Sequence, residues 1–168
     1  MKLAESSHRK LEAFFREYLN DTTFRLPQIY FYVGKFTNLL TALISVHGIT
    51  FGRRIFITSR LLYFNQNNLL KLPEDLAAHE ITHVLQYRRE GFIKFFYKYL
   101  TSFWRNLQKR ERWDAISRQN AYLEIPFEIE ARAVAAKFVE WNSSSSERRK
   151  DKLNQNFILY PFAFRLLK

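Results

Sequence analysis

The feature that most constrains this chain is a pair of histidines, His79 and His83, which stand four residues apart with Glu80 directly after the first. Pro73 and two acids behind it form a pattern typical of a helix start, because proline suits the first turn and acids suit the positive helix end. Apolar residues at helical spacing follow, which predicts a helix over about 76–88. Residues four apart share one helical face, so both imidazoles can point at one position.

This pair and its glutamate match the pattern His-Glu-x-x-His, which is suited to a catalytic metal. The sequence has no Cys, so histidines and carboxylates must bind any metal. Zinc binds imidazole nitrogen at about 2.0–2.1 Å and uses three protein ligands and an open position for catalysis. Glu80 is rotated out of the histidine pair, yet it is close enough to accept a proton from water at the metal. The composition gives only about 0.007 chance matches to this pattern.

A third ligand must come from another segment, and the acids around Pro126 are the main candidates. A helix that begins at Pro126 carries Glu128 in its first turn, and Ala131 on that helix allows a close approach to the first helix. Glu124 and Glu130 are competing candidates, since each lies near the same turn. The residues alone leave these three carboxylates open.

The two segments together resemble the zincin metallopeptidases that combine His-Glu-x-x-His with a distal Glu, the gluzincins. Glu128-Ile129-Glu130-Ala131 matches their Glu-x-x-Ala type motif. This resemblance implies that His79, His83 and Glu128 bind Zn²⁺ and that Glu80 is the catalytic base. Segments 47–51 and 76–86 are also similar to the small bacterial metallopeptidase-like core domain found with extracellular contractile injection systems. Segment 126–131 resembles uncharacterised small bacterial proteins with this architecture. The similarity extends over about 46–135.

One position departs from the gluzincin pattern. Many members place Asp four residues after the ligand Glu, where it hydrogen-bonds a ligand histidine, but this chain has Arg132 there. A group that stabilises the carbonyl oxygen in the transition state is also needed, and Tyr87, Tyr122, His47 and Arg132 are the candidates. The resemblance further implies that an edge strand within 49–58 pairs with an extended peptide substrate.

The rest of the pattern predicts an α+β fold, a mostly helical single domain over 1–168 with a small sheet and a metal-site core at about 46–135. We expect helices over about 11–19, 35–46, 92–113 and 127–141, two short strands at 49–51 and 54–58, and either a strand or a buried helical turn at 29–33. Residues 65–68 are predicted to be a loop, and the serines and charged residues after 142 a solvated connection.

The basic charge is concentrated in one segment. The chain has 27 Lys and Arg against 16 Asp and Glu, a net charge of +11, and residues 88–118 contribute +6 of it. Aromatic residues recur there at helical spacing, so the segment can lie on an anionic membrane surface, or bind nucleic acid or an acidic partner. The commoner arrangement, which we favour from sequence, is a helix that packs its aromatic face on the domain and exposes its charges.

The composition also bears on localisation and on the alternatives to catalysis. The longest uncharged stretch, 36–52, is interrupted by polar residues, and the first residues are too charged for a signal peptide. These features predict a cytoplasmic protein, with export by a non-classical route as the alternative. The first functional hypothesis is a zinc metallopeptidase acting on a peptide or protein substrate. The alternatives are a zincin-fold binding or assembly module with little or no activity, and a basic membrane- or nucleic-acid-associated protein with a structural metal.

Overall fold

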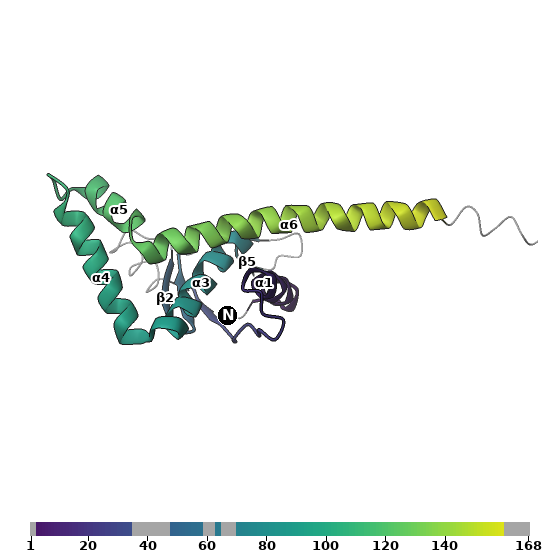
Figure 1. Ribbon diagram of the computed structural model, residues 1–168, viewed down its shortest axis with the longest axis horizontal. Coiled ribbons are helices and arrows are strands. Elements are labelled where there is room, and N and C mark those ends of the chain that lie inside the picture. Colours follow the sequence, from purple (N-terminus) through teal and green to yellow (C-terminus); the bar gives the residue numbers. More distant parts are fainter. Residues whose placement is uncertain (1–2, 35–47, 59–62, 65–69, 160–168) are drawn as a thin grey trace, which may run out of the picture.

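The chain forms a mostly helical structure with a small three-stranded mixed sheet, as the sequence predicts (Figure 1). The structure, a computed structural model, describes residues 3–34, 48–58, 63–64 and 70–159. In chain order its elements are α1 (Glu5–Tyr18), β1 (Tyr30–Tyr32), β2 (Gly48–Phe51), β3 (Arg54–Ile57), β4 (Tyr63–Phe64), β5 (Leu70–Lys71), α3 (Glu74–Glu90), α4 (Phe92–Gln108), α5 (Ala115–Leu123) and α6 (Pro126–Leu159). None of the described helices combines the length and the apolar character needed to cross a membrane.

The three-stranded sheet has the order β1-β3-β2. β3 pairs with β1 in parallel and with β2 antiparallel, and β4 and β5 form a separate antiparallel pair. The turn between β2 and β3 contains Gly52 at φ 58°, a left-handed conformation that glycine adopts without steric cost. The two strands around this turn are confirmed, and 29–33 contains a strand. Within the described sheet, β2 is an edge strand, and it packs against α3.

Helix α3 is the centre of the fold, because it contacts both β2 and α6 (Figure 1). Its predicted start after Pro73 is confirmed, and most of its middle turns are buried. The main core combines apolar residues of α1, the segment before β1, the sheet, α3 and α6: Leu11, Phe14, Phe15, Leu26, Ile29, Phe31, Ile55, Ile57, Ala77, Ala78, Ile81, Val84, Val134 and Phe138. This core holds the helix that carries His79 and His83 in a fixed orientation.

Helices α4 and α5 extend from one end of α3 and return to the start of α6 (Figure 1). Gly91, at φ 78°, ends α3 and lets α4 begin at once in a new direction. A second apolar cluster, formed by Tyr87, Phe95, Ile125 and Phe127, fixes this hairpin to the domain. The predicted helix over 92–113 is too long: α4 ends at Gln108, and Asp114 then caps α5 by accepting a hydrogen bond from the Ser117 backbone amide at 2.8 Å.

Helix α6 begins at Pro126 as predicted, but it continues to Leu159 instead of ending near 141, so the solvated connection predicted after 142 is wrong. The reason lies in how serine hydroxyls are satisfied. Ser143 and Ser144 donate to the carbonyl groups of Val139 and Trp141, each at 3.0 Å, so they need no turn to find partners. The helix predicted over 35–46 and the loop at 65–68 lie outside the described residues.

The close packing of α6 on α3 leaves room only for a small side chain at Ala131, which can be tested by substitution. Ala131 is fully buried, one turn after Glu128 on the same face, whereas Ala133 is exposed on the same helix. We expect Ala131→Leu to lower the free energy of unfolding by about 1–3 kcal/mol through overpacking, and Ala133→Leu to leave it unchanged. Urea unfolding of both variants measures the difference. Equal stability of the two would contradict the close packing.

Candidate metal centre

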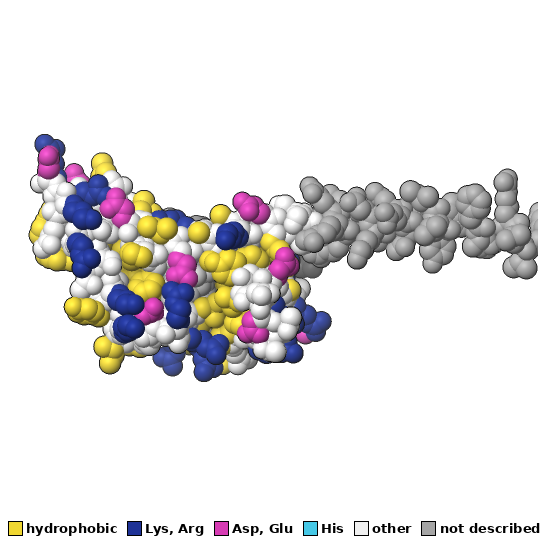
Figure 2. Space-filling model, viewed as in Figure 1, with side chains coloured by type: hydrophobic (Ala, Val, Ile, Leu, Met, Phe, Trp, Pro, Cys, Tyr) yellow, Lys and Arg dark blue, Asp and Glu magenta, His cyan; other side chains and the backbone are white. Residues whose placement is uncertain are grey.

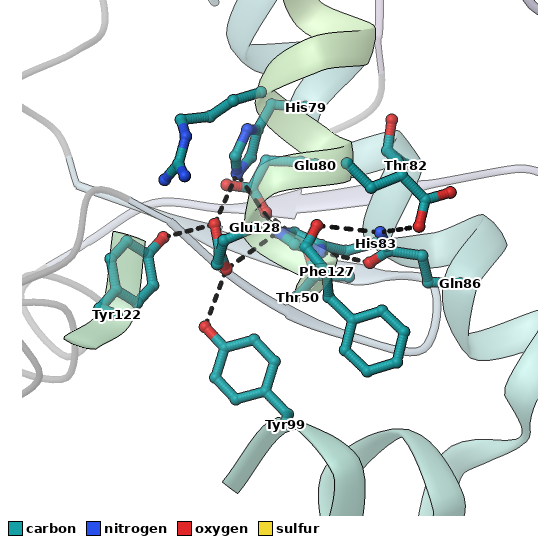
Figure 3. Close-up of polar contacts among 12 residues, drawn as sticks. Thr50, His79, Glu80, Thr82, His83, Gln86, Tyr99, Tyr122, Phe127 and Glu128 are labelled. Atoms are coloured by element: carbon teal, nitrogen blue, oxygen red, sulfur yellow. Dashed lines mark hydrogen bonds and ion pairs between the residues drawn. The ribbon is translucent and has the colours of Figure 1, made fainter. Parts of the chain in front are cut away.

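Three side chains that are distant in sequence converge at the contact between α3 and α6 (Figure 3). The Nε2 atoms of His79 and His83 lie 3.2 Å apart. Glu128, in the first turn of α6, places Oε2 at 3.3 Å from His79 Nε2 and Oε1 at 3.3 Å from His83 Nε2. The histidines meet because they are one turn apart on α3, and Glu128 meets them because Pro126 starts α6 beside that turn.

These separations fit a tetrahedral metal site. Ligand atoms at about 2.0–2.1 Å from a tetrahedral zinc lie about 3.3–3.4 Å from one another. The two Nε2 atoms are 3.2 Å apart, and each lies 3.3 Å from a different oxygen of the Glu128 carboxylate. Two imidazoles and one carboxylate are a donor set that suits zinc and several other transition metals. The structure therefore contains a group that can hold a metal ion, while the donor set leaves the identity of the metal open.

The Glu128 carboxylate is held by hydrogen bonds on both oxygens. The side chain is only 2% exposed, and its Oε1 and Oε2 accept from the hydroxyls of Tyr99 on α4 and Tyr122 on α5, each at 2.8 Å (Figure 3). Burial by itself raises the pKa of Glu128, but hydrogen bonds with His79 and His83 outweigh burial and hold this pKa well below its usual range. The carboxylate is therefore anionic.

The two tyrosines are stable as neutral donors. Burial, and then the charge of Glu128, raise the pKa of both Tyr99 and Tyr122 well above the usual tyrosine value. Neither hydroxyl ionises near neutral pH, so each keeps the proton that it donates to Glu128. These bonds fix the orientation of the carboxylate toward the histidines.

Gln86 sets the orientation and tautomer of His83. The Gln86 amide nitrogen donates to the Phe127 carbonyl and to Glu130 Oε2, both at 3.0 Å, so its oxygen must face His83 Nδ1 at 2.8 Å. A neutral His83 then carries its proton on Nδ1 and presents the lone pair of Nε2 to the centre.

Glu128 strongly affects the pKa of His83. Burial would lower the pKa of His83, but hydrogen bonding with Glu128 and the charges of Glu128 and Glu80 raise it to about 9. The centre thus has a strong local preference for positive charge. A divalent cation satisfies that preference when it replaces the proton.

Glu80 lies beside the centre and is held by β2. Its buried carboxylate accepts a hydrogen bond at Oε2 from the Thr50 hydroxyl at 2.5 Å. A Cβ at Gly48, on the same strand face as Thr50, would overlap the Glu80 carboxylate, so only glycine leaves room for it. Tyr87 donates to the Thr50 carbonyl at 2.8 Å and fixes the strand in turn.

Two cavities border the centre on different sides. An apolar cavity of about 200 Å³ lies between β2 and α4, lined by residues that include Ile49, Phe95 and Leu100 together with His83 and Glu128. A more polar cavity of about 520 Å³ includes His79, Glu80, Glu128, Gln119 and Arg132 in its lining. Gly48, Tyr122 and Glu128 line both, so the cavities meet at the candidate metal centre.

The competing carboxylates are engaged elsewhere. Glu124, the C-cap residue of α5, is exposed and pairs with Arg110. Glu130 receives two hydrogen bonds from the Arg89 guanidinium, each at 2.9 Å. The structure thus brings Glu128, and neither of its competitors, to the histidine pair.

The residues that the sequence suggests for stabilising the carbonyl oxygen differ in whether their polar atoms already have hydrogen-bond partners. Tyr87 is occupied by the Thr50 carbonyl, and Tyr122 by Glu128. Arg132 lines the polar cavity, donates to the Leu123 carbonyl through Nη2, and buries an Nη1 that has no hydrogen-bond partner among the described residues. His47 lies outside the described residues.

Sequence reasoning missed Gln86, Thr50, Gly48 and the role of Tyr99. Gln86 could have been found, because it follows His83 by three residues on the same helical face. Tyr99 gave no signal of its own, since it is one of many aromatic residues at helical spacing in α4.

The two tyrosines that orient Glu128 support a prediction on metal affinity. Tyr99→Phe and Tyr122→Phe should each weaken zinc binding by about 10- to 100-fold, because the carboxylate loses a fixed donor. Tyr97→Phe, on the exposed side of α4, is the matched control and should bind as the unaltered protein does. Competition with a chromophoric chelator measures the affinities. Affinities of all three variants equal to that of the unaltered protein would show that the hydroxyls do not position a ligand.

Comparison with models of known protein families, with curated proteins and with solved structures finds no match. The interpretation of the centre therefore rests on its own geometry and chemistry.

Proposed function

We propose that the chain is a zinc-dependent metallopeptidase in which His79, His83 and Glu128 bind the metal and Glu80 is the catalytic base. The observation that carries this proposal is the spacing of the three donor groups, 3.2–3.3 Å, beside a buried carboxylate on the next residue of α3. Bound zinc would supply the Lewis acidity that lowers the pKa of a water molecule and polarises the peptide carbonyl. The protein would supply the base, the substrate-binding surface and the group that stabilises the carbonyl oxygen.

Glu80 is the group that we assign as the base. Its carboxylate faces β2 and lines the polar cavity next to His79, where water can reach it. The Thr50 hydroxyl holds one carboxylate oxygen, and this restricts the orientation of the other. Glu80 would accept the proton of the attacking water and later donate it to the leaving amine.

The substrate would lie across the contact between the two cavities. Gly48 and Thr50 of β2 border the centre, which agrees with the sequence-based hypothesis that this strand faces the metal side. Because β2 is an edge strand of the described sheet, an extended peptide can add to it through backbone hydrogen bonds. The apolar cavity would then receive an apolar substrate side chain, and the polar cavity the chain on the other side of the scissile bond.

Arg132 is the group that we assign to the carbonyl oxygen. Arg132 lines the same cavity as Glu80, and its Nη1 is a buried donor without a hydrogen-bond partner among the described residues. A buried donor without a partner costs about 1–3 kcal/mol, which an oxygen that gains negative charge would offset. Many gluzincins have an Asp at this position that hydrogen-bonds a ligand histidine. In this chain Arg132 would instead contact the substrate.

Removal of the base tests the proposal directly. Glu80→Gln should slow cleavage of an unstructured protein substrate by about 10²- to 10⁴-fold, because the amide cannot accept the proton. Zinc affinity should stay within the range of the unaltered protein, since Glu80 is not a proposed ligand. Glu140→Gln, at an exposed position of α6, is the control and should leave cleavage unchanged.

The same assay distinguishes the proposal from its alternative. A zinc-loaded protein that cleaves no peptide in a diverse peptide library, with Glu80→Gln indistinguishable from it, would contradict catalysis and favour a zinc-containing binding module.

Substitution of Arg132 separates transition-state stabilisation from metal binding. Arg132→Gln should lower kcat by about 10²- to 10³-fold without a change in zinc affinity, and Arg132→Lys should restore part of the loss. Steady-state kinetics and the chelator competition provide the two readouts. An unchanged kcat in Arg132→Gln would remove this residue from the mechanism.

A further inference from the structure

Helix α4 exposes large apolar residues beside the apolar face that packs against the domain. The inner face packs through Phe95, Tyr99 and their neighbours on the cluster that contains Tyr87 and Phe127. The sequence-based expectation of one buried aromatic face is therefore incomplete. Beside this inner face four large residues are exposed, by 84%, 70%, 59% and 49%: Ile93, Tyr97, Leu100 and Trp104. Leu100 also lines the rim of the apolar cavity.

These four residues form one continuous stripe, which we call the outer stripe. Their spacing of four, three and four residues places them on a single face of the helix. Trp113, in the loop after α4, extends the stripe, because its ring lies 5.2 Å from that of Trp104 and is also exposed. Contiguous exposed apolar surface of this kind marks a site of interaction.

Basic side chains run beside the outer stripe. Lys94, Lys98 and Arg105 each directly follow a residue of the stripe and are exposed, so they form a parallel row about 100° around the helix. Glu90 pairs with both Lys94 and Lys98, at 3.4 and 2.7 Å, and therefore balances only one of these two charges. Hydrophobic side chains and Lys or Arg side chains both reach the surface over α4 (Figure 2).

This charge distribution favours one of the three partners that could bind the outer stripe: a second copy of the chain, a nucleic acid or a lipid surface. A second copy of the chain would bring two segments of net charge +6 together, which like-charge repulsion opposes. Nucleic acid would contact the basic row and stack on Tyr97 and Trp104. It would leave Ile93 and Leu100 without a partner, however, since they offer neither stacking nor hydrogen bonds to bases. A lipid surface matches both rows, because aliphatic and aromatic side chains enter the acyl boundary while Lys and Arg extend to anionic headgroups.

We propose that the outer stripe and its basic row dock α4 on the surface of a membrane that contains anionic lipid, with the helix parallel to the bilayer plane. Ile93 and Leu100 would enter the hydrocarbon boundary, and Tyr97 and Trp104 would lie at headgroup level, where their polar atoms can stay hydrated. The inner face of α4 would keep its contacts with the domain. This docking requires neither bound metal nor catalysis, although Leu100 borders the apolar cavity as well.

Vesicle binding by the full chain tests the proposal. Vesicles of phosphatidylcholine with phosphatidylserine should co-sediment with the protein at low salt, vesicles of phosphatidylcholine alone should bind much less, and added salt should release the protein. Trp104 and Trp113 should shift their emission to the blue on binding. Trp141 is a constant background, since it packs on Phe14 and Phe138.

A pair of double variants supplies the control. Ile93→Ser with Tyr97→Ser should weaken vesicle binding by at least about tenfold, while Ile129→Ser with Val139→Ser, at exposed positions of α6, should not. Circular dichroism establishes that both remain folded. The proposal is overturned by absence of binding to anionic vesicles at low salt, by equal loss in both double variants, by binding to duplex DNA without binding to vesicles, or by a concentration-dependent dimer that buries the two tryptophans.

Discussion

A carboxylate buried between two imidazoles is the interaction on which the rest of this structure depends. Glu128 is anionic and almost fully buried, so its charge must be met by donors or by a cation. His79 and His83 meet it from α3, and this contact joins the first turn of α6 to the middle of α3. The helix that fills the core is therefore also the helix that carries the candidate metal ligands, and packing and chemistry cannot be changed separately there.

The same carboxylate ties the outlying elements to the centre. Tyr99 and Tyr122 reach it from α4 and α5, so the hairpin is attached to the domain by polar bonds as well as by the aromatic cluster. On the other side, Thr50 and Gly48 bring β2 against Glu80. Helices α4 and α5 and strand β2, which border the two cavities, thus each contribute a residue that contacts Glu128 or Glu80. A substrate that moves β2 or α4 would act directly on the centre.

Local sequence signals predicted those features that depend on one segment. Pro73 and the periodic apolar residues were enough for the helix of His79 and His83, and the break expected between the strands at 49–51 and 54–58 falls at Gly52. The arrival of Glu128 at the histidines was predicted by resemblance, because spacing alone did not separate it from Glu124 and Glu130. Tyr99 and Gln86 could not be assigned, since their roles depend on how α4 and α6 pack. The outer stripe was hidden for a similar reason: only the packed fold separates the aromatic residues of α4 that face the domain from those that face outward.

The most direct test of a metal centre between α3 and α6 is elemental analysis of the full chain purified without chelators. The proposed function predicts one zinc per chain, and His79→Ala purified in the same way should contain none, because two ligands of the three do not hold the ion tightly. A folded, unaltered protein that contains no transition metal and takes up none on addition of zinc would contradict the account.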